Sequence, residues 1–283
     1  MSTMSQTTRP AKRSNWLMNT FDSVRIRNYR LLWLGSLTEH GGEWMERIGI
    51  GWLVYDLTGK AVMVGLVEFL RYMPFFVFPL IGGVIADRMD RKKLLGATFI
   101  AFILNATWLV WLVRTDNLQV WHIMVYAVLA GTIVSFNHPA RNTLLPNLVP
   151  KEKLLNAITL DSAAVAGVRF IVAPISGILI ARVGVDWVLG LRGLGCVVAL
   201  FWLWQLTAPA TPVKARNESM WKNLKEGFRY TYESKPIFQL TLLSVVPLLL
   251  VQPYLAMLPI FTKDILKSGP EILGYLNGAS GAG

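Results

Sequence analysis

The chain has very little of the side-chain chemistry that enzymes and metal sites use. Its 283 residues include one cysteine, Cys196, and three histidines, none of them four residues from another. A single cysteine makes no internal disulfide and no thiolate metal cluster. The sequence also lacks a G-x-x-x-x-G-K-S/T phosphate loop. We therefore expect no metal, no other cofactor, no ATP hydrolysis by this chain and no enzymatic activity.

Acidic residues are scarce, and several long runs carry no charge at all. Asp and Glu total 17 against 28 Lys and Arg. Runs without any of these four residues cover 94–113, 120–140 and 236–262, and single charges interrupt 162–181 and 187–208. About 20 apolar residues cross a bilayer as a helix. With 31–55 and 61–86, which carry internal charges, and the short run 271–283, the sequence predicts seven spans and the start of an eighth. The predicted fold class is an all-α polytopic membrane protein.

The net charge of +11 follows the predicted topology. Of the 28 basic residues, 19 fall on the side of the N-terminus, 5 on the opposite side and the remainder within spans. This bias is the positive-inside rule. It places the N-terminus in the cytoplasm of a multi-pass cell-membrane protein and argues against nucleic-acid binding.

The chain divides into four predicted segments. Residues 1–30 form a basic cytoplasmic N-terminus, without the short apolar core of a secretory signal. Residues 31–206 form an N-terminal bundle of six helices. In the cytoplasmic linker 207–235, one helical stripe is apolar, as expected of a helix lying on the membrane surface; it consists of Met220, Trp221, Leu224 and Phe228. Residues 236–283 begin a second bundle that is incomplete, so we expect a truncated fold.

The turn between the second and third spans resembles a known family signature. Residues 82–93 read G-G-V-I-A-D-R-M-D-R-K-K, similar to the G-x-x-x-D-R-x-x-R-R/K loop of the major facilitator superfamily. N-Y-R-L-L-W at 28–33, W-L-V-Y-D-L-T-G at 52–59 and L-L-P-N-L-V-P at 144–150 resemble its branch of enterobactin exporters and related efflux proteins. The resemblance implies a twelve-helix, proton-driven exporter in a bacterial inner membrane.

The same resemblance gives roles to the loop residues. Asp87 caps the loop and pairs across the interface between the two halves, while Gly82 and Gly83 let helices approach closely. The cations that hold the loop at the inner surface are Arg88, Arg91 and Lys92. The alternative is a solvated turn. The family's partner for Asp87 lies in the second half, which this chain lacks.

The first span carries an unusual set of charges. Glu39, Glu43, Glu46 and Arg47 share one broad helical face. A charge near the bilayer centre costs at least ~2.5 kcal/mol, so these groups should face a wet cavity or a partner. One hypothesis makes Glu43, with Glu39 beside it, the proton acceptor. The alternative is that Glu43–Arg47 and Glu68–Arg71 are self-neutralised structural pairs.

The fifth span supplies the remaining candidates. Asp161 is expected to pair with Arg141 at the inner ends of their spans. Arg169 lies deeper and either contacts an anionic substrate or pairs with a glutamate of the first span. The proposed substrate cavity contains Arg169, Glu46, Arg47 and Gln252. Gly167, Pro174 and Gly177 resemble an antiporter motif, although helix packing alone requires the same residues.

Together these features predict a secondary active transporter. It would export a small amphiphile, such as a drug or a siderophore, in exchange for protons, by rocking two bundles about a site at the bilayer midplane. Its partners would be the lipid bilayer, a small-molecule substrate and protons. The alternative is a non-transporting truncated membrane protein that needs a partner half.

Overall fold

The computed structural model describes residues 21–78, 89–207, 229–230 and 232–282. Within these ranges the secondary structure is helical and no strand occurs. The longer elements are α2 (Arg27–Thr58), α3 (Ala61–Val77), α5 (Arg91–Arg114), α6 (Val120–Leu144), α7 (Leu154–Val183), α8 (Val185–Gln205), α10 (Lys235–Ile260) and α11 (Pro270–Ala282). Short turns are η1 (Asp22–Arg25), η2 (Leu145–Asn147), η3 (Lys151–Lys153) and the π-helical η4 (Phe261–Ile265).

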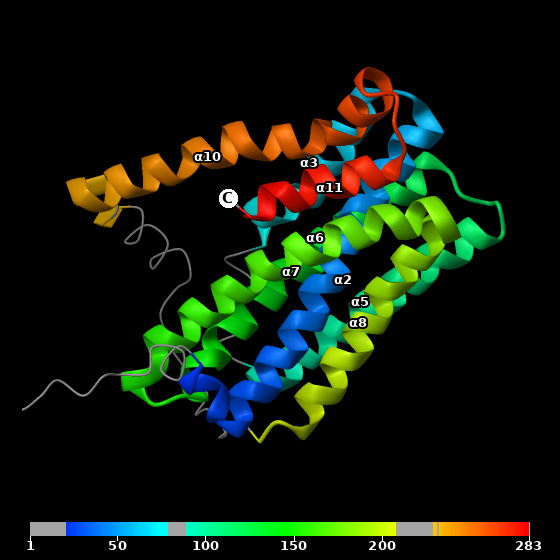
Figure 1. Ribbon diagram of the computed structural model, residues 1–283. Coiled ribbons are helices and arrows are strands. Elements are labelled where there is room, and N and C mark those ends of the chain that lie inside the picture. Colours follow the sequence, from blue (N-terminus) through cyan, green and yellow to red (C-terminus); the bar gives the residue numbers. More distant parts are fainter. Residues whose placement is uncertain (1–20, 79–88, 208–228, 231, 283) are drawn as a thin grey trace, which may run out of the picture.

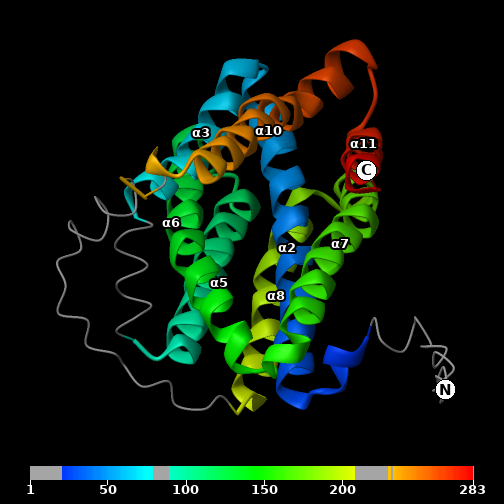
Figure 2. The ribbon, with the colours of Figure 1, turned by 90° about the vertical axis from the view of Figure 1, so that its left-hand side faces the viewer.

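Helix α2 lies at the centre of the bundle. It packs along α8 and α7 and also touches α3 and α6, while α5 packs on both α6 and α8 (Figures 1 and 2). Helix α11 runs along α7, and α10 contacts α3, α11 and α2. The charged side chains in the middle of α2, from Glu39 to Arg47, therefore lie where helices surround it.

The bundle has two ends that are useful landmarks. The N-terminal end holds the start of α2, the turn formed by η2 and η3, and the end of α8. The far end holds the α2–α3, α5–α6 and α7–α8 connections (Figure 1). Gly59 ends α2 with φ 61°, and Gly184 separates α7 from α8 with φ 100°, backbone angles that favour glycine.

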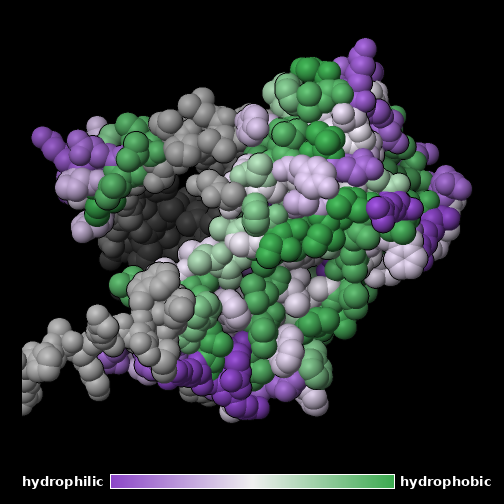
Figure 3. All heavy atoms as spheres, viewed as in Figure 1, coloured by the Kyte–Doolittle hydropathy of each residue, from purple (hydrophilic) through white to green (hydrophobic). Residues whose placement is uncertain are grey.

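Four helices are long and apolar enough to cross a membrane by length and composition. They are Arg91–Arg114, Val120–Asn147, Lys151–Val183 and Val185–Gln205, with mean hydropathy from 1.5 to 2.0. Large apolar side chains such as Leu104, Leu155 and Trp204 are exposed on their sides. Figure 3 shows apolar residues over the sides of the helices and hydrophilic residues gathered at their ends. Such surfaces suit contact with lipid.

The other predicted spans are helical where the structure describes them. Runs 31–55 and 236–262 lie mainly within α2 and α10, and 271–283 lies mostly in α11. The run 61–86 is helical from Ala61 to Val77, and its last part falls outside the described residues. Their crossing of a membrane, and the division into a six-helix bundle and an incomplete second one, remain predictions. The apolar stripe of the linker also lies outside the described residues.

Polar contacts tie α2 to η4 at the far end. Lys263 Nζ lies 2.6 Å from Asp56 Oδ1, and the Tyr55 hydroxyl donates to the carboxylate of Asp264. Toward its own start at Lys235, α10 diverges from α6 and α7 (Figure 1). We call these two contacts, Asp56–Lys263 and Tyr55–Asp264, the far-end contacts.

Candidate functional site

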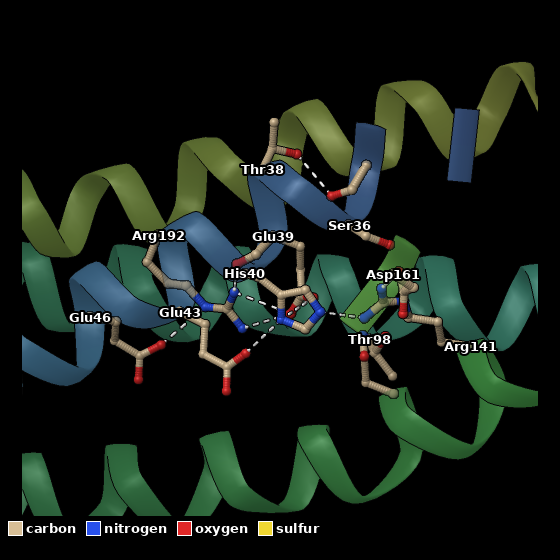
Figure 4. Close-up of polar contacts among 12 residues, drawn as sticks. Ser36, Thr38, Glu39, His40, Glu43, Glu46, Thr98, Arg141, Asp161 and Arg192 are labelled. Carbon is tan, nitrogen blue, oxygen red and sulfur yellow. Dashed lines mark hydrogen bonds and ion pairs between the residues drawn. The ribbon is translucent and has the colours of Figure 1, made fainter. Parts of the chain in front are cut away.

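The charged residues in the middle of α2, from Glu39 to Arg47, are buried or half-buried. Glu46 is fully buried, and Glu39 and His40 are 4% and 8% exposed. Figure 4 shows Glu39, His40 and Arg192 converging between α2 and α8, with Glu43 and Glu46 along the same stretch of α2. Buried charges are stable only when paired, so their partners define the site.

Arg192 of α8 binds two of the glutamates. Its Nη1 donates to the backbone oxygen of Glu39 at 2.8 Å and lies 3.3 Å from the Glu39 carboxylate. Its Nε lies 3.0 Å from Glu46 Oε2, and its guanidinium lies 3.9 Å from the centre of the Phe102 ring. A Cβ at Gly42 would stand only 3.0 Å from Arg192 Cα, so glycine there allows the close approach. The sequence showed Arg192 only as a single charge in an apolar run.

Helix α3 supplies two more partners. Arg71 forms an ion pair with Glu46, and Glu68 lies 3.5 Å from Arg47. The sequence suggested, as one alternative, ion pairs within a helix, Glu43–Arg47 and Glu68–Arg71. The structure instead forms Arg47–Glu68 and Arg71–Glu46, both between α2 and α3. The reason is that α2 and α3 are adjacent, so each arginine reaches the carboxylate on the neighbouring helix.

A second line of contacts runs from α2 through α6 to α7. His40 Nδ1 lies 3.2 Å from Glu43 Oε2, and His40 Nε2 contacts Nη1 of Arg141. Nη2 of Arg141 donates to the Asp161 carboxylate at 2.5 Å. A guanidinium only donates, so His40 Nε2 must accept, which leaves the proton on Nδ1 to be donated to Glu43. Sequence reasoning missed His40; its position three residues before Glu43 was the available signal.

Glu39, His40 and Glu43 also present ligand atoms within 4.8 Å of one another. Arg192 and Arg141 contact two of these three side chains. A metal ion would be repelled by both guanidinium groups. The cluster is therefore a network of charges balanced by the chain's own cations, and we do not assign it a metal.

Arg169 lies in a different environment, near α11. It donates to the Ser280 hydroxyl, and its guanidinium lies 4.3 Å from the centre of the Trp44 ring. Arg47 lies 5.4 Å from the same ring. Two cations thus contact one indole, an arrangement that cation–π attraction favours. Gln252 lies on α10, and the structure does not describe its side chain.

Of the motif in the fifth span, two residues pack against α11. The Cα atom of Gly274 would be 3.0 Å from a Cβ at Gly177, and Pro174 borders Gly278. Gly167 does not share this role, because a Cβ there would meet no atom within 4 Å. The described part of α11 ends beside Phe170, one turn short of Gly167.

The predicted loop signature is described only at its end, because Gly82, Gly83, Asp87 and Arg88 lie outside the described residues. Asp90 caps α5, accepting from the backbone nitrogens of Lys92 and Lys93 at 2.8 and 3.1 Å. Arg91 donates to the Thr143 oxygen at 2.9 Å, and Lys92 Nζ donates to the Leu206 oxygen at 2.6 Å. These two cations link α5 to the ends of α6 and α8.

Comparison with known proteins gives a consistent set of relatives. Macrolide efflux protein A of Streptococcus pyogenes is 22% identical over 256 residues, which is 89% of this chain and 63% of the relative. The staphyloferrin A transporter of Staphylococcus aureus is 26% identical over 82% of this chain and 59% of its own length. Enterobactin exporter EntS of Escherichia coli O1:K1 / APEC is 27% identical over 82% and 56%.

The chain thus spans about three fifths of the length of these curated relatives. The family model described as transmembrane secretion effector matches residues 18–283, nearly the whole chain. This match includes every charged residue of the α2 network, and it agrees with the apolar helices that surround them. The chain belongs to the transmembrane secretion effector family of major facilitator transporters.

Proposed function

We propose that this chain is part of a secondary active exporter that carries a small amphiphile, a drug or a siderophore, across the cell membrane in exchange for protons. The named activities of the relatives, macrolide efflux and siderophore transport, support the class of cargo. The basic bias of the predicted inner side supports a cytoplasmic N-terminus, and the bacterial relatives support a bacterial cell membrane, which is the inner membrane where there are two.

The observation that carries the proposal is the line of contacts Glu43–His40–Arg141–Asp161. It joins α2, α6 and α7, and two of its members on α2, Glu43 and His40, change charge with protonation, whereas Arg141 remains a cation. A proton on His40 Nε2 would place a donor opposite the guanidinium of Arg141, and the contact would break. A proton on Glu43 would remove the charge that holds His40 Nδ1–H. Proton binding on α2 would therefore free α6 to move.

The substrate site that we propose lies around Trp44 of α2. Arg169 and Arg47 flank Trp44 there, next to α11. Two cations and an indole suit an aromatic or amphiphilic molecule that carries a negative charge. Gln252 of α10 stays part of the proposed cavity. Glu46 does not, because it is fully buried and paired with Arg192 and Arg71. The antiporter reading of Gly167, Pro174 and Gly177 stays part of the proposal.

The test is Glu43→Gln in the complete gene product, reconstituted in vesicles with a pH gradient. The glutamine amide keeps the size of the side chain but does not bind or release a proton at the pH of the experiment. We expect efflux to fall to the rate measured without a gradient, while substrate binding at equilibrium is retained. The control is Glu233→Gln, which removes an exposed carboxylate paired with Arg229 and should leave efflux unchanged. Gradient-driven efflux by Glu43→Gln at the rate of the unmodified protein would refute the coupling assignment.

A further inference from the structure

A small pocket lies inside the bundle, on the side of the charged network that faces the N-terminal end. Helices α2, α5, α6 and α8 enclose it. Apolar walls come from Leu32, Leu95, Phe99 and Leu203, and the polar residues are Ser36, Glu39 and Arg141. Its room is that of about one water molecule. The pocket is separate from the Trp44–Arg169 region, which borders α11.

One side chain of this pocket has an unused hydrogen-bond donor. Arg141 is 7% exposed, and both of its terminal nitrogens are engaged, by His40 and Asp161. Its Nε is buried and has no hydrogen-bond partner. A buried donor without an acceptor is costly, and internal waters commonly satisfy such groups.

The same pocket offers partners for the other atoms of a water molecule. Glu39 has a carboxylate that accepts, and Arg192 holds it in place. Ser36 donates its hydroxyl to the Leu32 oxygen at 2.9 Å, so its oxygen is able to accept. Two to four polar partners are what a buried water requires.

We propose that Ser36, Glu39 and Arg141 hold a buried water molecule, and that protons pass through it between the N-terminal end and the His40–Glu43 pair. Glu39 Oε2 lies 3.7 Å from His40 Nδ1, and Nδ1 lies 3.2 Å from Glu43 Oε2. When Nδ1 gives its proton to Glu43 it is able to take one from Glu39, which connects the water site to that pair. The charged and titratable groups around the His40–Glu43 pair include Glu39 on α2, Arg71 on α3, Arg141 and His138 on α6, and Arg192 and Cys196 on α8, while Asp161 of α7 is reached through Arg141. The transport step of this inference rests on the proposed function, whereas the water site does not.

The consequence is a separation of routes. Protons would travel among α2, α5, α6 and α8, and the substrate would bind at Trp44 and Arg169, where α2 and α7 lie near α11. A bulky substrate would then have no means to block proton entry.

Radiolytic footprinting tests the water site directly, because hydroxyl radicals formed from a bound water modify the side chains beside it. Phe99 lines the pocket and Phe102 lies one turn further along α5, and both are buried, at 5% and 1% exposed. We expect modification of Phe99 and none of Phe102 in the unmodified protein. Ser36→Val fills the pocket and should reduce the modification of Phe99 to that of Phe102. The matched control is Thr107→Val, which also replaces a hydroxyl side chain with valine, at an exposed position of α5 away from the pocket, and should retain it. Equal modification of the two phenylalanines in the unmodified protein would overturn the proposal.

The route is tested with the same variants in vesicles that contain a pH-sensitive dye. Ser36→Val should slow proton uptake while leaving substrate binding at equilibrium unchanged, and the control Thr107→Val should behave as the unmodified protein. If vesicles with the Ser36→Val variant take up protons at the rate of the unmodified protein, the proposed route is wrong. This conclusion holds even if Glu43→Gln abolishes proton coupling. If the unmodified protein takes up no protons, the proposed function fails, and the footprint alone decides the water site.

Discussion

At the scale of single residues, Arg192 determines how the carboxylates of α2 are held. It is 1% exposed and lies against both Glu39 and Glu46. Glu46 has a second cation in Arg71, but the structure shows Glu39 with no other guanidinium among its described ion pairs. Removal of Arg192 would therefore leave a buried carboxylate without its countercharge.

We predict that Arg192→Met destabilises the protein by about 3–5 kcal/mol, the usual cost of breaking a buried ion pair from one side. Methionine keeps much of the side-chain volume, so the loss reports charge and hydrogen bonding. Arg114→Met is the matched control, because Arg114 is 53% exposed in its pair with Asp186 and such pairs contribute about 1 kcal/mol or less. Thermal unfolding in detergent measures both. Equal losses for the two variants would contradict the prediction.

The residues of the site were predictable from sequence to different degrees. Glu39, Glu43, Glu46 and Arg47 stood out because charges inside an apolar run need a reason. Their partners did not, because pairing depends on which helix packs against α2. His40 was missed for the same reason: its role becomes visible only when Arg141 of α6 lies against it.

At the scale of helices, small residues set how closely α8 approaches α2. A Cβ at Gly195 would lie 2.6 Å from the backbone oxygen of Thr38, which is too close for any side chain. The neighbouring Gly190 of the same helix has no atom within 4 Å of its Cβ position. Substitution by alanine at Gly195 therefore tests close packing between helices, whereas the same change at Gly190 tests only helix propensity.

We predict that Gly195→Ala destabilises the protein by about 1–3 kcal/mol, because α8 must move away from α2. Gly190→Ala should be neutral or stabilising, since alanine favours a helix over glycine by about 1 kcal/mol. Chemical unfolding followed by circular dichroism compares the two. A loss for Gly190→Ala equal to that for Gly195→Ala would mean that the close approach is unimportant.

Hydropathy located the helices well and their ends less well. The runs 94–113 and 120–140 fall inside α5 and α6, but α7 begins at Leu154, well before the run 162–181. The reason is that hydropathy marks only the apolar part of a helix, whereas hydrogen bonding continues through polar turns. Caps such as Gly59 and Asp90 set the ends.

At the scale of the whole molecule, charge bias predicts which end of the bundle faces the cytoplasm. We expect Asn117→Cys, in the α5–α6 connection, to react with a membrane-impermeant maleimide in intact cells. Asn147→Cys, in η2 at the other end, should react only after permeabilisation. The native Cys196 is fully buried, so its background should be low. The opposite labelling pattern would show that the predicted orientation in the membrane is wrong.

The far-end contacts have a consequence for the working cycle. Lys263 and Asp56 are 39% and 56% exposed, and ion pairs this accessible to solvent contribute about 1 kcal/mol or less. An ion pair of this strength favours the arrangement in which η4 contacts α2 but does not make it the only one, since conformers that differ by a few kcal/mol are both populated. Separation of Lys263 from Asp56 would therefore let η4 and the end of α10 shift against α2 at a small cost in free energy.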